Sequence, residues 1–214
     1  MAPEQKRKEK VNMARYTEPR NKKARRIGQD LGLKTNPKLL ERRINTPPGQ
    51  HGRKGKKKLS DYGIQLLEKQ KAKIIYGVLE RQFKKYYTLA SRDPLATGVV
   101  LLSILERRLD NVVFRLGLAP TRAAARQLVT HGNILVNNTK LSIPSYQINE
   151  GDTISLSKTA SGIPYIKELI SAKDNKPAPW LERKAIVGKV KRLPVRDDIQ
   201  EDIQEQLIVE YYSR

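Results

Sequence analysis

Positive charge limits how this 214-residue chain can fold on its own. Its sequence has 43 lysine and arginine residues against 22 acidic ones, which gives a formal net charge of +21 at pH 7. Hydrophobic residues make up only 38% of the chain, so we expect a modest buried core. A folded body with this excess charge repels itself unless a polyanion lies beside it. Nucleic acid and an anionic membrane are the two candidates.

The charge is uneven along the chain. Residues 1–60 contain 19 basic and 5 acidic residues, whereas residues 195–214 contain 2 basic and 6 acidic residues. The chain therefore has a strongly basic head and an acidic tail. Residues 1–14 are polar with few apolar side chains, so we expect a basic extension that stays disordered until it binds. The tail contains "DDIQEDIQEQLIVEYY", which predicts a short acidic helix followed by a strand-like end.

Several function classes lack their signatures. No run approaches the length of about 18 apolar residues that a transmembrane helix needs, so no membrane partner is expected. The start, "MAPEQKRKEKVN", has no apolar segment of the kind found in a secretory signal. Cysteine is absent, and His51 and His131 lie far apart, so we predict no metal and no cofactor. No nucleophile–base set or phosphate-binding glycine loop occurs, so we predict no enzyme activity.

The segment from Asp61 to Ala90 has the pattern of a helix. Ser60 is suited to cap its start, and an apolar stripe recurs at helical spacing. The stripe, which we expect to be core, contains Ile75, Leu79, Phe83 and Tyr86. The opposite side carries Lys69, Lys73, Arg81 and Lys84. A break is expected near Lys71, and the apolar run "GVVLLSIL" further on predicts a buried helix or strand.

Another helix is predicted from Thr121, a capping residue, to Gly132. It carries Arg122 and Arg126 on one face, four residues apart, with no acidic residue nearby in sequence to pair them. Guanidinium groups match phosphate geometry, and the helix N-terminus adds partial positive charge. A hairpin, "NILVNNTKLSI", follows with Asn137 at its turn. These features predict a surface that recognises the backbone of structured RNA, and the alternative is a solvated basic face.

A known RNA-binding module resembles one stretch of the chain. The stretch is "ERRLDNVVFRLGLAPTRAAARQLVTHGNILVNNTKLSIPSYQINEGDTI", Glu106 to Ile154, and the module is named after the fourth protein of the small ribosomal subunit. RNA-modifying enzymes and synthetase tails also carry this module. Other stretches resemble the bacterial-type ribosomal protein family itself: "MARYTEPRNKKARR", "PPGQHG", "LSDYGIQLLEKQKAKIIYGVLERQFKKYY" and the terminal "QLIVEYYSR". The resemblance covers nearly all of residues 13–214.

The resemblance implies an α+β fold in two parts. Residues 15–96 and 178–214 are expected to form a mostly helical rRNA-binding domain. Residues 97–177 are expected to form an inserted α/β module of two helices and a β-hairpin sheet, with a motif core at 106–170. Many family members carry a zinc-binding cysteine cluster near the N-terminus. The matching stretch here, "RNKKARRIGQDLGLKTN", has no cysteine, so the resemblance is to a metal-free form.

The function that the resemblance implies is that of a structural constituent of the small ribosomal subunit. Such a protein binds 16S-type rRNA directly, at a multi-helix junction in the five-prime domain, and so nucleates assembly of the subunit body. Implied partners also include small-subunit protein five, with an effect on decoding accuracy, and, for some members, their own mRNA. The implied location is the cytoplasmic ribosome, or the plastid stroma for an organellar member.

The resemblance also implies which module residues contact RNA. These are Arg107, Arg108, Arg115, Thr121, Arg122, Arg126, Gln127, His131, Gly132, Asn133 and Asn137. Asp110 is expected to orient nearby arginines and not to touch phosphate. The basic N-terminal region is expected to add Arg15, Arg20, Lys22, Lys23, Arg25, Arg26, Arg53 and Lys54.

Two other interpretations stay open at this point. An RNA-modifying enzyme could use the module for delivery, although the chain leaves no room for a catalytic α/β domain. A basic regulator could bind mRNA or DNA as its main role, because electrostatic attraction to phosphate is independent of sequence. Preference for folded junction RNA over duplex DNA at physiological salt would separate the ribosomal interpretation from the regulatory one.

Overall fold

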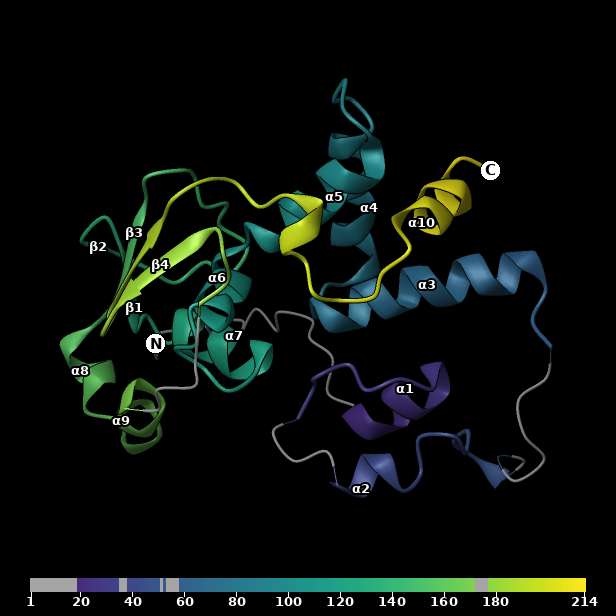
Figure 1. Cartoon of the computed structure of the whole chain (residues 1–214), viewed down its shortest axis with the longest axis horizontal. Helices are drawn as coiled ribbons and strands as arrows, with labels where there is room; N and C mark the ends of the chain where they lie inside the picture. Colours follow the sequence, from purple (N-terminus) through teal and green to yellow (C-terminus); the bar gives the residue numbers. More distant parts are fainter. Residues whose placement is uncertain (1–18, 35–37, 51, 53–57, 172–176) are drawn as a thin grey trace, which may run out of the picture.

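The computed structural model describes residues 19–34, 38–50, 52, 58–171 and 177–214. It has a helical body and a sheet with helices of its own (Figure 1). The helical body contains α1 (Arg20–Ile27), α2 (Lys38–Glu41), α3 (Asp61–Ile75), α4 (Glu80–Ala90), α5 (Thr97–Glu106) and the C-terminal α10 (Glu205–Tyr212). The chain returns from the sheet to place α10 against α3 and α5. Within the described ranges, no helix is long and apolar enough to cross a membrane.

Two helices occupy the segment for which the apolar pattern predicts a helix broken near Lys71. Ser60 caps α3 as expected, because its side chain accepts a hydrogen bond from a first-turn backbone N–H at 3.3 Å. After α3 ends, Gly77 takes a φ of 62°, a conformation that continues neither helix. The break therefore lies at residues 76–79 and not near Lys71. Leu79 immediately precedes α4 and remains 38% exposed, so its predicted place in the core is wrong.

A hydrophobic cluster holds the helical body together. Phe83 and Tyr86 of α4 are buried in it, as the apolar stripe predicts. The run "GVVLLSIL" is helical, and α5 buries three of its leucines completely: Leu101, Leu102 and Leu105. Ile208 and Tyr212 of α10 contribute from one helix face, four residues apart. The strand-like end predicted for the tail is therefore wrong, and the acidic stretch before it forms only a 3-10 turn, Arg196–Asp198.

The second part of the fold combines two helices with an antiparallel sheet. Helices α6 (Leu109–Arg115) and α7 (Arg122–Thr130) precede it. The sheet contains β1 (Ile134–Val136), β2 (Thr139–Leu141), β3 (Thr153–Leu156), β4 (Leu181–Lys184) and β5 (Val187–Val190) in the order β2-β1-β3-β5-β4. Leu135 lies opposite Lys140 on β2 and Ser155 on β3. Helices α8 (Lys158–Ser161) and α9 (Pro164–Ser171) connect β3 to β4.

A separate hydrophobic cluster forms the core of this second part. It joins α6 and α7 to the sheet, through residues such as Val112, Leu128 and Ile154. Trp180, Leu181 and Val190 also belong to it, whereas the buried leucines of α5 belong to the helical cluster. The hydrophobic cores therefore change at about residue 107 and after β5. The domain boundaries at residues 97 and 177 stay predictions. The α+β class is confirmed, because helices dominate and the sheet is a single antiparallel one.

Candidate nucleic-acid interface

Local sequence positions the helix that carries the predicted RNA-binding face. Thr121 caps α7, because its Oγ1 accepts a hydrogen bond from the backbone N–H of Ala124 at 3.2 Å. Gly117 before α7 and Gly132 after it take φ angles of 70° and 68°, so each glycine permits a sharp turn of the chain. Thr121 is thus a helix cap, as its position predicts, and it is buried. Its predicted RNA contact stays a prediction.

The predicted pair of free arginines on α7 is not free. Arg122 donates from Nε to Asn111 Oδ1 at 2.8 Å and from Nη2 to the carboxylate of Glu201. Arg126 donates from Nη1 to Asp110 Oδ2 at 3.0 Å. The Arg122 side chain is only 12% exposed and that of Arg126 31%. The prediction that these two arginines form an exposed, unpaired stripe is therefore wrong, because tertiary packing supplies acids that local sequence does not show. Their predicted RNA contacts stay predictions.

Two arginines earlier in the chain also bind acidic side chains inside the protein. Arg108 is fully buried, with Nε and Nη2 donating to the two oxygens of Asp110 at 3.0 and 2.6 Å, and Nη1 donating to the Tyr86 hydroxyl at 2.8 Å. Arg115 donates to both oxygens of Glu106, at 2.9 and 2.7 Å. Both guanidinium groups are therefore occupied by internal partners, and their predicted RNA contacts stay predictions. The expected role of Asp110 is confirmed, since it orients Arg108 and Arg126.

Glu106, Arg115, Arg122 and Glu201 form one buried ion-pair network, because Glu201 accepts hydrogen bonds from both arginines. Its two acids balance its two cations, so the network offers no net charge to a phosphate. Burial raises the pKa of Glu201, but the two guanidinium groups outweigh it and the pKa lies below its usual value. Burial and the Glu106 charge raise the pKa of Tyr76, whose hydroxyl donates to Glu106 at 2.7 Å.

The buried ion-pair network also fastens the two parts of the fold together. Glu106 is the last residue of α5 in the helical body, and Glu201 lies in the returning C-terminal segment. Their partners belong to the module: Arg115 ends α6 and Arg122 begins α7. The guanidinium of Arg122 further lies over the rings of Tyr76 and Phe114, at 5.2 and 4.6 Å. Sequence reasoning missed Glu201, and the only available signal was the acidic character of the tail.

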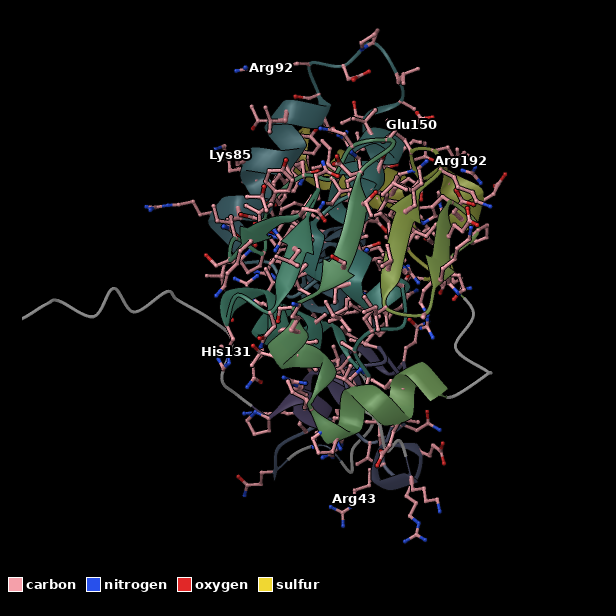
Figure 2. The ribbon with its side chains drawn as sticks, turned by 90° about the vertical axis from the view of Figure 1, so that its left-hand side faces the viewer. Arg43, Lys85, Arg92, His131, Glu150 and Arg192 are labelled. Atoms are coloured by element: carbon pink, nitrogen blue, oxygen red, sulfur yellow. The ribbon has the colours of Figure 1, made fainter. Side chains whose placement is uncertain are left out.

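A polar edge at the end of α7 does remain open to solvent. Gln127 and His131 are exposed, and with Asn133 they line a hollow of about 290 Å³, whose other walls are Pro120, Ala124, Leu128 and Ile163. Figure 2 shows His131 projecting from the side of the molecule. The exposed Lys140 of β2 crosses over Gly132, where an added Cβ would lie 2.3 Å from its side chain. The structure thus brings together Gln127, His131, Gly132 and Asn133, all predicted site residues.

The remaining predicted module residues fix loops. Arg107 donates from Nε to the Ile148 carbonyl at 3.0 Å and from Nη2 to Asn149 Oδ1 at 2.7 Å. Asn137 takes a φ of 49° at the hairpin turn, as predicted, and its Oδ1 accepts a hydrogen bond from the backbone N–H of Thr153 at 2.9 Å. Both side chains reach the surface in part, so these bonds leave them near solvent.

The N-terminal cations divide into structural and exposed ones. Arg20 donates to the Leu33 carbonyl at 2.9 Å, and Arg25 donates to the carbonyls of residues 46 and 47 at 2.9 and 3.2 Å. Lys22 and Arg26 of α1 are exposed, while Lys23 is half-buried and has an interaction partner. Arg15, Arg53 and Lys54 lie outside the described residues, as does His51. Across the described part of the chain, no group of three or more His, Asp or Glu is placed to hold a metal ion.

Comparisons with known proteins agree with the two-part fold. A family model described as the ribosomal protein S4/S9 N-terminal domain matches residues 15–106, and one described as the S4 domain matches residues 107–154. The small ribosomal subunit protein uS4 of Herpetosiphon aurantiacus is 53% identical over 211 residues. The uS4 proteins of Parabacteroides distasonis and Aquifex aeolicus are each 50% identical, over 204 and 211 residues. Each match spans 94% of this chain and all of the relative.

The two family models identify a class of protein in which an S4-type RNA-binding module follows the N-terminal domain of ribosomal proteins S4/S9. The chain belongs to the bacterial-type family of small ribosomal subunit proteins uS4. It is accordingly a structural constituent of the small ribosomal subunit and not an enzyme, which removes the interpretation as an RNA-modifying enzyme.

Proposed function

We propose that this chain binds small-subunit rRNA of the 16S type directly, at a multi-helix junction in the five-prime domain. The observation that carries the proposal is the open edge at the end of α7, where Gln127, His131 and Asn133 surround a hollow beside Lys140. Amide, imidazole and ammonium groups on a rigid helix end can meet phosphates, 2′-hydroxyls and unstacked bases. The exposed Lys22 and Arg26 of α1 would contact the same RNA from the helical body.

The buried arginines support this proposal indirectly. Arg115 and Arg122 pair with Glu106 and Glu201, and Arg108 donates to the Tyr86 hydroxyl of α4, so these arginines hold the module against the helical body. A protein that presents two surfaces in a preset orientation loses less entropy when it binds a folded RNA junction. Recognition would then depend on the shape of the junction more than on its base sequence.

The proposal includes the more specific roles that the family resemblance implies. Binding early to a junction would nucleate assembly of the subunit body. The protein would contact small-subunit protein five, influence decoding accuracy, and in some settings repress its own mRNA. Its location would be the cytoplasmic ribosome, or the plastid stroma for an organellar source. We also retain a helical rRNA-binding domain and an S4-type module as its two functional parts, with boundaries near residues 107 and 191, where the hydrophobic cores change.

The test is a footprint of the isolated junction RNA with wild-type protein and with the double variant Gln127→Ala/His131→Ala. Both side chains are exposed, so the variant should melt like wild type and lose protection of one discrete RNA segment. Gln200→Ala/Gln206→Ala, which truncates two exposed side chains elsewhere, is the matched control. An unchanged footprint and affinity for the first variant would remove the α7 edge from the interface.

A further inference from the structure

The outer face of α4 presents positive charge that the fold does not use. Arg81, Lys84 and Lys85 are exposed on this helix, and Arg92 is exposed in the turn that follows it. None of the four has an acidic partner among the described residues. Two acids adjoin these residues in sequence: Glu80 binds lysines of α3, and the exposed Asp93 accepts a hydrogen bond from the backbone N–H of Leu95 at 3.0 Å. We name these four residues the α4 cation face.

Two lysines of the neighbouring helix α3, unlike the α4 cation face, are neutralised by an acidic residue. Lys69 and Lys73 on α3 both bind Glu80 at the start of α4, at 2.9 and 2.8 Å. Burial alone would raise the pKa of Glu80, but these ammonium groups and the Tyr212 hydroxyl lower it to about 2. The cations that the sequence places on one side of a single helix therefore separate into two sets. Lys69 and Lys73 bind Glu80 within the protein, whereas Arg81 and Lys84 are exposed at its surface.

The α4 cation face is held on a rigid support. Phe83, Tyr86 and Ala90 anchor α4 in the helical core, and the Tyr86 hydroxyl accepts a hydrogen bond from the buried Arg108. Arg81 and Lys85 are four residues apart, so their Cβ atoms lie about 5–6 Å from each other on one face. A short row of cations on a fixed helix suits successive phosphates of one strand more than it suits a single small anion.

The direction of this face relates it to the α7 edge. In Figure 2, Lys85, Arg92 and His131 project from the same side of the molecule, with Lys85 and Arg92 towards one end and His131 towards the other. Arg192 and Glu150 lie on the opposite side in that view. One folded RNA lying along this side would meet both surfaces.

We propose that the α4 cation face binds the backbone phosphates of a second segment of the same folded RNA. This inference rests on the proposed function and adds a contact surface to it. The contacts are electrostatic and independent of base identity, and they complement the polar α7 edge. The face would therefore contribute affinity and salt dependence, while the α7 edge contributes local recognition.

The test compares two variants that each remove three positive charges. Arg81→Gln/Lys84→Gln/Lys85→Gln removes most of the α4 cation face. Lys184→Gln/Lys189→Gln/Lys191→Gln removes three exposed lysines from β4, β5 and the residue after β5. Affinity for the junction RNA is measured over a salt series for wild type and both variants. A thermal melt of each protein confirms that these surface changes leave the fold intact.

The α4 variant should make the negative slope of log affinity against log salt shallower by about 2–3, since each phosphate contact contributes about 0.7–0.9 to its magnitude. It should also lose protection of one RNA segment that the Gln127→Ala/His131→Ala variant still protects, while the control variant keeps the wild-type footprint. Equal slopes and footprints for the two charge variants would overturn the inference. A wild-type protein without preference for junction RNA would instead contradict the proposed function, so the two failures are distinguishable.

Discussion

Replacing Glu201 by glutamine removes the carboxylate that Arg122 and Arg115 share in the buried ion-pair network. The substitution keeps the size and shape of the side chain and removes only its charge. Arg115 retains Glu106 as a partner, but Arg122 loses its carboxylate. The network is then left with one uncompensated positive charge between the module and the helical body.

The expected cost follows from burial and from the contacts that survive. The side chains of Glu201 and Arg122 are 16% and 12% exposed. Removing one partner of a buried pair costs about 3–5 kcal/mol. Arg122 keeps its bond to Asn111 and its position over two aromatic rings. We therefore expect the free energy of unfolding to fall by about 2–4 kcal/mol, somewhat less than the loss of a fully buried partner costs. For a chain of this size the melting temperature should fall by about 4–16 °C.

Urea unfolding followed by circular dichroism measures this change at pH 7. Glu182→Gln is the matched control, because Glu182 is partly exposed and its lysine partners lie 4.0 and 3.7 Å away. Its loss should cost under about 1 kcal/mol. A double-mutant cycle with Arg122→Met should return a coupling energy of about 1–3 kcal/mol between residues 122 and 201. If the free energy of unfolding of Glu201→Gln lies within about 0.5 kcal/mol of the wild-type value, the network does not fasten the two parts of the fold together.

Three further outcomes are expected. Phe83→Ala should lower the free energy of unfolding by about 3–5 kcal/mol because Phe83 is fully buried, while Leu79→Ala should cost under about 1 kcal/mol; equal urea midpoints would contradict this ranking. Glu80 has a pKa of about 2 against an ordinary 4.5, so its stabilisation is complete above pH 4.5 and is lost as the pH falls towards 2. Melting temperatures of wild type and Glu80→Gln should converge over that range, and a constant gap would refute the assignment. Gly132→Ala should destabilise by about 1–2 kcal/mol, because an alanine there needs a left-handed φ and displaces Lys140, and an unchanged melt would show that the turn relaxes.

Local chemistry made parts of the fold predictable from sequence. Ser60 and Thr121 cap helices, and Asn137 takes a positive φ at the hairpin turn, because these properties depend on a residue and its immediate neighbours. The apolar stripe likewise placed Phe83 and Tyr86 in the core. The fold class followed from the family resemblance, and the family comparisons confirm that resemblance.

Long-range pairing explains what sequence could not provide. Arg122 has no acid near it in the chain, yet its partner Glu201 arrives from the returning C-terminal segment once the two parts have folded. Which arginines face inward is therefore decided by tertiary packing. Four arginines predicted to contact RNA bind carboxylates within the protein: Arg108, Arg115, Arg122 and Arg126. The break between α3 and α4 depended on Gly77, a single residue that periodicity over a long window does not detect.

Direct recognition of the rRNA junction is tested most simply by competition. Wild-type protein is titrated with the isolated junction domain of small-subunit rRNA at several salt concentrations, with tRNA and duplex DNA as competitors. A shape-reading interface predicts tight binding that survives both competitors at moderate salt. Weak binding that is equal for all three nucleic acids and collapses with salt would leave only the attraction of a polycation, and would contradict the proposed rRNA-binding function.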